Sequence, residues 1–253
     1  MAEKMKLNLL RMPLDILMTL LSIILMGGTV LFPDDRIHQI CGISLIVLWV
    51  VHIVLNRRWY GSLFKGKYQP FRIMQLVVNC GVLICALCLM ISGLLMAWFI
   101  PSDWVGGALG FARTTHLLAS HWYYIFMAFH IGLHGAKLVR IALQSSTSSA
   151  TQNSRTNSSN IKIIALQIIC ILISLYGIYV FIIRGVWKYM FGLQQFFFFD
   201  FERGYVLFAI DYISIIVLFA TISYYAEKLD SPLRGYRRLH IVRRTSATNA
   251  ENR

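Results

Sequence analysis

Charged residues are scarce in this chain, and acidic residues are the scarcest. Only 14% of the 253 residues are Asp, Glu, Lys or Arg, and 24 basic residues face 11 acidic ones. Because 57% of the residues are hydrophobic, the composition is far too apolar for a water-soluble domain of this length. We therefore expect the chain to lie in a lipid bilayer. Its net charge of +13 indicates membrane topology rather than nucleic-acid binding, since the basic residues occupy the gaps between apolar runs.

The cysteine pattern excludes several kinds of site. Five cysteines occur, all within apolar runs, where cysteine usually serves as a small buried hydrophobic residue. Cys85 and Cys88 form a C-x-x-C motif, but no second pair follows and no histidine comes directly after it. This pattern argues against an iron–sulfur cluster, a zinc ribbon and a covalently attached c-type haem. The odd number of cysteines also gives no disulfide framework.

Six apolar runs are long enough to cross about 30 Å of hydrocarbon as helices. They cover residues 14–32, 37–55, 73–100, 115–143, 163–183 and 205–225. The first run has no small-residue cleavage site, so we expect a retained helix rather than a signal peptide. Six spans place both termini on one side, and 19 of the 24 Lys and Arg residues lie on that side. The positive-inside rule then predicts that both termini are cytoplasmic.

The predicted spans divide the all-α chain into four parts. Residues 1–143 are expected to form a four-helix membrane bundle, and the Ser/Thr/Asn-rich residues 144–161 a flexible cytoplasmic linker. Residues 162–226 should form a two-helix membrane extension, followed by a basic cytoplasmic tail at 227–253. The aromatic segment 187–201 is expected at the outer membrane interface. No loop is long enough for a soluble catalytic domain, so any redox chemistry needs a partner or a small molecule.

Two pairs of histidines repeat one spacing. His38 and His52 are 14 residues apart in the second run, and His116 and His130 are 14 apart in the fourth. Fourteen helical steps of about 100° nearly close four turns, so each pair shares one helix face, about 21 Å apart along the axis. The two helices run in the same direction, which puts His38 level with His116 and His52 level with His130. Bis-histidine ligation of a haem iron requires one imidazole from each of two helices at the same depth.

Other histidines leave alternatives open. His134 lies one turn after His130, and three roles remain for it: replacing His130 as the inner ligand, bonding a haem propionate, or lining a quinone pocket. The 14-residue match favours His130 as the ligand. His121 is about 140° round the helix from His116 and is expected at the interface, and His240 in the basic tail is expected to be solvated. Hydrogen-bonded histidines between helices are the alternative to ligands, and the repeated spacing disfavours it.

Three segments resemble a known family of membrane proteins. They are residues 38–60 (H-Q-I-C-G-I-S-L-I-V-L-W-V-V-H-I-V-L-N-R-R-W-Y), 64–75 (F-K-G-K-Y-Q-P-F-R-I-M-Q) and 130–135 (H-I-G-L-H-G). They are similar to the flavinylation-associated cytochromes of bacterial membranes, and the resemblance covers about the first 143 residues. It implies a four-helix b-type cytochrome core in the bacterial inner membrane with two haem b groups. It also implies that the axial ligands are His38, His52, His116 and His130.

The spacing and the resemblance together favour a dihaem b-type cytochrome. Such a protein would move electrons between a quinone pool or a cytoplasmic donor and a flavoprotein or other redox partner outside. Quinol oxidation would also need an acid–base group, for which Asp103, Asp211 and His134 are candidates. The sequence leaves open the direction of flow, the oligomeric state, the role of the last two helices and whether the chain is a subunit of an oxidoreductase.

Two rival functions use the same features differently. A metal-ion transporter would use the histidines as sites along a path, but it would prefer carboxylates or thiols grouped with them at one depth. Asp and Glu are nearly absent from the predicted spans. A redox-silent membrane anchor or assembly subunit would use the aromatic outer segment and the last two helices as docking surfaces.

Overall fold

Helices account for the regular structure of the described part of the chain. The computed structural model describes residues 2–62, 69–135 and 155–251, with side chains for 11–62, 69–101, 103–135 and 161–229. Within these ranges there is no strand. The long helices are α1 (Ala2–Leu25), α2 (Asp35–Leu55), α4 (Pro70–Leu95), α6 (Ala108–Leu133), α8 (Arg155–Ile183) and α10 (Gly204–Glu251). Short helices between them are η1 (Thr29–Leu31), α3 (Arg57–Tyr60), α5 (Ser102–Val105) and α9 (Val186–Met190).

Four of the long helices identify the chain as a membrane protein. They are α2, α4, residues Ile161–Ile183 of α8 and residues Gly204–Leu229 of α10, each long and apolar enough to cross a bilayer. Four of the six predicted spans are thereby supported. Within the residues searched, α1 and α6 do not meet the same criterion. Helix α6 is the most thoroughly buried of the long helices, so the other helices shield its polar side chains from lipid.

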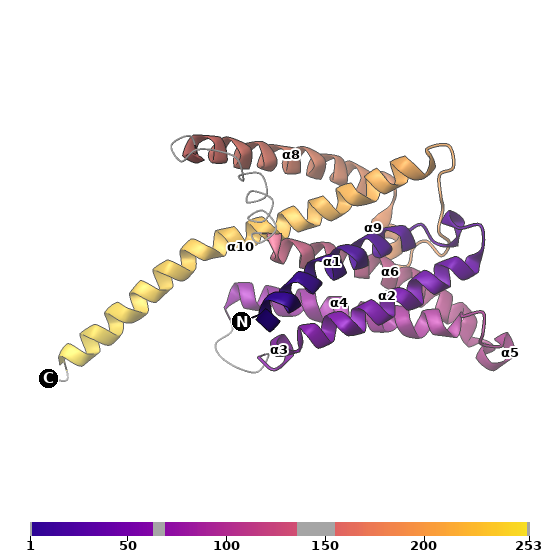
Figure 1. Cartoon of the computed structure of the whole chain (residues 1–253), viewed down its shortest axis with the longest axis horizontal. Coiled ribbons are helices and arrows are strands. Elements are labelled where there is room, and N and C mark those ends of the chain that lie inside the picture. The colour runs from indigo at the N-terminus through magenta and orange to yellow at the C-terminus, as the bar shows by residue number, and fades with distance from the viewer. Residues whose placement is uncertain (1, 63–68, 136–154, 252–253) are drawn as a thin grey trace.

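Helix α6 is the centre of the fold. It packs closely against α4 and α10, and more briefly against α9, while α8 packs against α10 (Figure 1). Glycines allow some of this contact: a Cβ at Gly132 would collide with the backbone carbonyl of Ala220, and one at Gly177 would collide with that of Ser214. Two backbones can approach this closely only where side chains are absent, as is common between membrane helices. The core of the molecule therefore lies between α6, α8 and α10.

Helix α2 is attached much more loosely. It packs mainly along α1, approaches α4 at only a few positions and hardly touches α6 with its backbone. None of its 21 residues is buried, although it lies within the bundle seen in Figure 1. The Asp34 side chain starts the helix by accepting a hydrogen bond from the backbone N–H of Arg36 (2.8 Å), as N-cap residues do. This cap places His38 at the start of α2.

Some element boundaries differ from the predicted ones. The fourth span was expected at residues 115–143. Helix α6 begins at Ala108 and ends at Leu133, with His134 at its C-cap, and residues 136–143 of the predicted span lie outside the described residues. Residues 144–154 of the predicted linker lie outside the described residues, and the rest of the linker is already helical in α8. Helix α10 likewise continues through the predicted tail to Glu251. The length of an apolar run shows only which residues can lie within a bilayer. A helix continues beyond the run wherever the polar residues that follow still favour helical structure.

Candidate functional site

The four spaced histidines form two close pairs. The rings of His38 on α2 and His116 on α6 have centroids 6.3 Å apart, with their planes at 67°. The rings of His52 and His130 also have centroids 6.3 Å apart, with their planes at 71°. The two helices that scarcely touch through their backbones thus meet through imidazole rings at two depths.

The separation within each pair can be tested against ligation of one metal ion. An imidazole nitrogen binds a metal ion at about 2.0–2.1 Å. The ring centroid lies about 1.1 Å behind that nitrogen, as follows from ring bonds close to the C–N length of about 1.33 Å. Two imidazoles on opposite sides of one ion therefore have centroids about 6.2–6.4 Å apart. The observed 6.3 Å of both pairs fits such a site.

Hydrogen bonds to three of these rings favour the tautomer that ligation requires. Nδ1 of His52 lies 2.9 Å from Oδ1 of Asp15, and Nδ1 of His130 lies 2.8 Å from Oδ1 of Asn79. Both oxygens are acceptors, so both Nδ1 atoms donate. A neutral imidazole that donates from Nδ1 keeps its lone pair on Nε2, where a metal ion binds.

The third ring, His116, has a hydroxyl as its partner. Its Nδ1 atom lies 3.1 Å from the Ser92 hydroxyl, which itself donates to the carbonyl of Cys88 (2.6 Å). The hydroxyl oxygen therefore accepts from His116. By contrast, Nδ1 of His38 is buried and makes no well-formed hydrogen bond within the described residues, although the Gly28 backbone is close enough to interact with it.

Helix α1 contributes the strongest of these partners. Asp15 reaches His52 from α1, and one turn earlier Arg11 donates to the carbonyl of Leu55 (2.7 Å) at the C-terminal end of α2. A cation suits this end of a helix because its last carbonyl groups carry partial negative charge. The two contacts fix α1 along the inner end of α2 and hold the Asp15 carboxylate against the ring.

Two glycines lie close to the outer histidines in sequence or in space. A Cβ at Gly93 of α4 would lie 3.5 Å from Cε1 of His116, so only a small residue leaves this ring face accessible. Gly42, one turn after His38 on α2, has no atom within 4 Å of the place where a Cβ would lie. Together with the absence of buried residues on α2, these positions fit a flat ring system between α2 and the α4–α6 pair.

His134 lies beside His130 rather than in its place. Their ring centroids are 5.0 Å apart with planes at 72°, and His52 faces His130. His134 also makes a further interaction of its own. The contact with Asn79 and the pairing with His52 both favour His130 as the inner ligand.

His121, which we expected at the membrane interface, is enclosed within the protein. Its side chain is only 1% exposed. The ring stacks on Tyr189 of α9, with centroids 4.5 Å apart and planes at 9°, and its Nδ1 atom lies 2.8 Å from the carbonyl of Leu117. The short helix α9 covers this face of α6, and helical periodicity alone could not reveal that cover.

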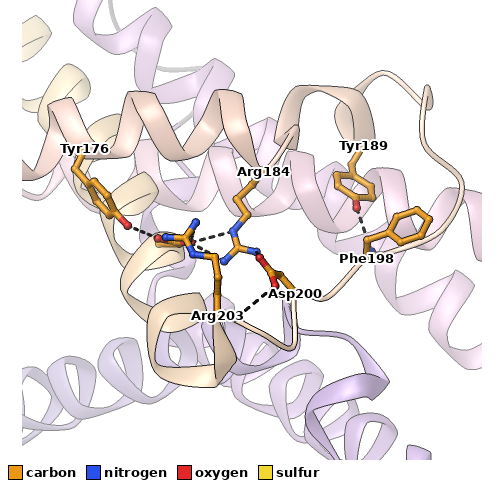
Figure 2. A network of polar contacts seen from close by, with 7 residues as sticks. Tyr176, Arg184, Tyr189, Phe198, Asp200 and Arg203 are labelled. Atoms are coloured by element: carbon orange, nitrogen blue, oxygen red, sulfur yellow. Dashed lines mark hydrogen bonds and ion pairs between the residues drawn. The ribbon is translucent and has the colours of Figure 1, made fainter.

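Asp211, one of the carboxylates considered for proton transfer, lies in a network of polar contacts. Its side chain is 0% exposed, and it accepts hydrogen bonds from Tyr176 (2.6 Å) and from two nitrogens of Arg184 (2.7 and 2.9 Å). Arg203 is 3.7 Å away, and the charge of Asp211 raises the pKa of this guanidinium above its usual value. Figure 2 shows Tyr176 of α8, Arg184 just after α8, and Asp200 and Arg203 of the loop before α10 lying close together.

The outer aromatic segment is half packed against the protein. Phe197 and Phe199 pack against the core, while Phe196 and Phe198, which alternate with them, are strongly exposed. Asp103, the other carboxylate considered for proton transfer, lies exposed in α5 and away from both histidine pairs in sequence. The five cysteines are free and partly buried, without a disulfide.

Sequence reasoning missed the partners of the ligand candidates. Asp15, Asn79 and Ser92 each lie in or next to a predicted apolar run, and each contacts a paired histidine. An isolated polar residue within a span is costly, so Asp15 and Asn79 were detectable as unusual. Their partners were not, because an inter-helix contact depends on how the helices are rotated against each other.

Known proteins offer no further guide to this site. Comparisons with protein-family models, with curated proteins and with solved structures found no match. Among the described residues there is no group of three or more His, Cys, Asp or Glu side chains that could hold a metal ion. The two histidine pairs are therefore the features from which a function can be argued.

Proposed function

We propose that the chain is a dihaem b-type cytochrome that moves electrons across the membrane. The observation that carries the proposal is the repetition of one geometry: two histidine pairs, each joining α2 to α6, each with ring centroids 6.3 Å apart. The hydrogen bonds at Nδ1 of His52, His116 and His130 support it, because they leave Nε2 of each ring as the ligating atom. The sequence resemblance to flavinylation-associated cytochromes agrees with this function.

Each pair has its own role in the proposal. His38 and His116 would hold the outer haem, and His52 and His130 the inner one. A bound haem supplies one-electron chemistry at its iron, with a potential set by ligands, hydrogen bonds and burial. The protein contributes by fixing the ring orientations through Asp15, Asn79 and Ser92.

The membrane arrangement follows the sequence prediction. We propose six spanning helices, with α1 and α6 crossing alongside the four apolar ones, and both termini at the cytoplasmic face of the bacterial inner membrane. The beginning of α1 and the end of α10 lie toward the same end of the molecule in Figure 1, as an even number of spans requires. Electrons would pass between a quinone or a cytoplasmic donor and a flavoprotein or other redox protein outside.

A haem count on the purified protein tests the proposal. The reduced-minus-oxidised spectrum should show b-type bands, and a haem assay should give two haems per chain. His52→Ala and His130→Ala should each remove the same one haem, while His38→Ala and His116→Ala should remove the other. His134→Ala is the matched control, since this histidine lies next to His130, and it should retain both haems.

The results that contradict the proposal are equally distinct. A wild-type protein without b-type bands would leave the membrane-anchor and metal-transport functions as the alternatives. Retention of both haems in His130→Ala together with loss of one in His134→Ala would move the inner ligand to His134. Loss of both haems in every variant would show that the two pairs are not separate sites.

A further inference from the structure

The inner and outer histidine pairs differ in what their Nδ1 atoms contact. In the inner pair, His52 donates to the carboxylate of Asp15 and His130 to the amide oxygen of Asn79, at 2.9 and 2.8 Å. In the outer pair, His116 donates to a hydroxyl at 3.1 Å, and His38 makes no well-formed hydrogen bond within the described residues. The stronger acceptors are thus concentrated at the inner pair.

Asp15 also acts on the inner pair as a whole. Its Oδ1 atom accepts a hydrogen bond from Nδ1 of His52. Its charge is also close enough to act through space on His130. Asp15 is 55% exposed while His52 is 24% exposed, so solvent or headgroups partly screen the carboxylate. We therefore expect it to shift a property of the inner site rather than to decide whether that site exists.

A carboxylate on Nδ1 changes the electronic character of a ligating imidazole. The charge-assisted hydrogen bond draws the Nδ1 proton toward the oxygen, which makes the ring a stronger electron donor at Nε2. Stronger donation stabilises the oxidised iron more than the reduced iron, because the oxidised iron carries one more positive charge. The nearby negative charge of Asp15 acts in the same direction, so both effects lower the reduction potential at the inner pair.

Among the residues that the structure describes, no carboxylate is hydrogen-bonded to a histidine of the outer pair. The Ser92 hydroxyl is neutral and shares its hydrogen-bonding capacity with the carbonyl of Cys88. Asp35, in the first turn of α2, acts on His38 through space only, and its side chain is exposed. A screened charge without a hydrogen bond has the weaker influence on the ring.

We propose that Asp15 is a positioning residue that lowers the midpoint potential of the inner haem below that of the outer haem. The inference rests on the proposed function, since it requires haem at both pairs. This ordering makes transfer of one electron from the inner to the outer iron favourable, with the inner iron oxidised and the outer iron reduced. Asp15 would thereby set the direction of electron flow, from the cytoplasmic face toward a redox protein outside.

Redox titration of the purified holoprotein, followed at the b-type absorption bands, tests this role. The wild type should give two components, and His52→Ala should remove the one of lower potential. Asp15→Asn keeps the shape and an acceptor oxygen but removes the charge, so it should raise the lower potential and leave the higher one unchanged. Asp15→Glu retains a carboxylate and should stay close to the wild type.

Two matched controls separate the hydrogen bond from general electrostatics. Asp35→Asn removes one carboxylate beside the outer pair, where no hydrogen bond links it to His38, and it should move the higher potential by less than Asp15→Asn moves the lower one. Ser92→Ala removes a neutral acceptor and should affect the higher component alone. Equal shifts in Asp15→Asn and Asp35→Asn would overturn the role assigned to the hydrogen bond.

The remaining outcomes distinguish this inference from the proposed function. If two haem components are present but Asp15→Asn moves neither, the dihaem function stands and the role of Asp15 is wrong. If His52→Ala removes the component of higher potential, the proposed ordering is wrong whatever Asp15 does. A wild-type protein without haem would instead overturn the function on which the inference rests.

Discussion

Helix α6 is held in opposite ways on its two sides. Toward α10 the backbones are in direct contact, so that a Cβ at Gly132 would collide with the carbonyl of Ala220. Toward α2 the backbones hardly touch, and two pairs of imidazole rings bridge the space instead. We therefore expect the α10 side of α6 to contribute mainly to stability, and the α2 side to carry the histidine pairs of the proposed haem sites. Substitutions on the two sides should therefore change different measured quantities.

The largest effect on stability is expected at Asp211. Replacing it with Asn removes the buried charged partner of the Arg184 guanidinium, which is only 14% exposed, and leaves only the half-exposed Asp200 carboxylate, 3.9 Å away. Breaking a buried ion pair in this way costs about 3–5 kcal/mol. Thermal unfolding in detergent, followed by helical circular dichroism, should show a clear fall in the midpoint. At temperatures where the variant is folded its haem content should match the wild type, and loss of haem would contradict the division between the two sides.

A smaller but substantial effect is expected at Gly132. A Val at this position would force α6 away from the Ala220 backbone, because a carbonyl oxygen cannot yield as a flexible side chain can. Overpacking of this kind costs about 1–3 kcal/mol. The same unfolding measurement should report it. Gly107→Val, at the N-cap of the same helix, is the control, because a Cβ there meets nothing within 4 Å. Equal midpoints for the two variants would show that the close contact is not stabilising.

Local periodicity accounts for the parts of this site that the sequence could predict. An α-helix returns to the same face after 14 residues, so the four histidines of the two pairs could be assigned to shared faces before any packing was known. For His121 the same rule showed only that this residue faces away from His116, and it did not predict what covers that face. The cover that α9 provides there depends on a turn 64 residues later in the chain, at Gly185, and no local pattern connects the two.

Apolar composition was less informative for α6, the helix that carries one histidine of each pair. Apolar content identifies helices that face lipid, and it supports α2, α4, α8 and α10 as spans. Helix α6 carries His116, His121 and His130 and is enclosed by its neighbours. A helix at the centre of a bundle can be polar because protein, not lipid, surrounds it. The Asp15 contact was hidden for a related reason, since it joins two helices whose relative rotation the sequence does not specify.

A modest effect is expected where α9 is attached to α6. The indole Nε1 of Trp122 donates to the carbonyl of Met190 (2.8 Å), and Trp122→Phe removes this bond while keeping an aromatic ring. A hydrogen bond of this type contributes about 0.5–1.5 kcal/mol. Faster hydrogen exchange confined to α9 would report its loosening, with the exchange of α2 as the internal control. Equal protection of α9 from exchange in the wild type and in Trp122→Phe would show that ring packing alone holds α9 against α6.

The smallest effect on stability, and the sharpest test of the comparison, is expected at Gly42 on the loose side. An Ala there meets nothing within 4 Å, so the unfolding midpoint should stay unchanged or rise slightly, since Ala favours a helix over Gly by about 1 kcal/mol. Gly42→Leu should also leave the unfolding of the haem-free protein nearly unchanged. If a haem lies between His38 and His116, however, the longer side chain one turn from His38 should reduce occupancy of the outer site and spare the inner one. A Gly42→Leu variant with full haem content would show that Gly42 does not face the haem. The contacts of the outer haem would then be limited to the histidine rings and to α4 and α6.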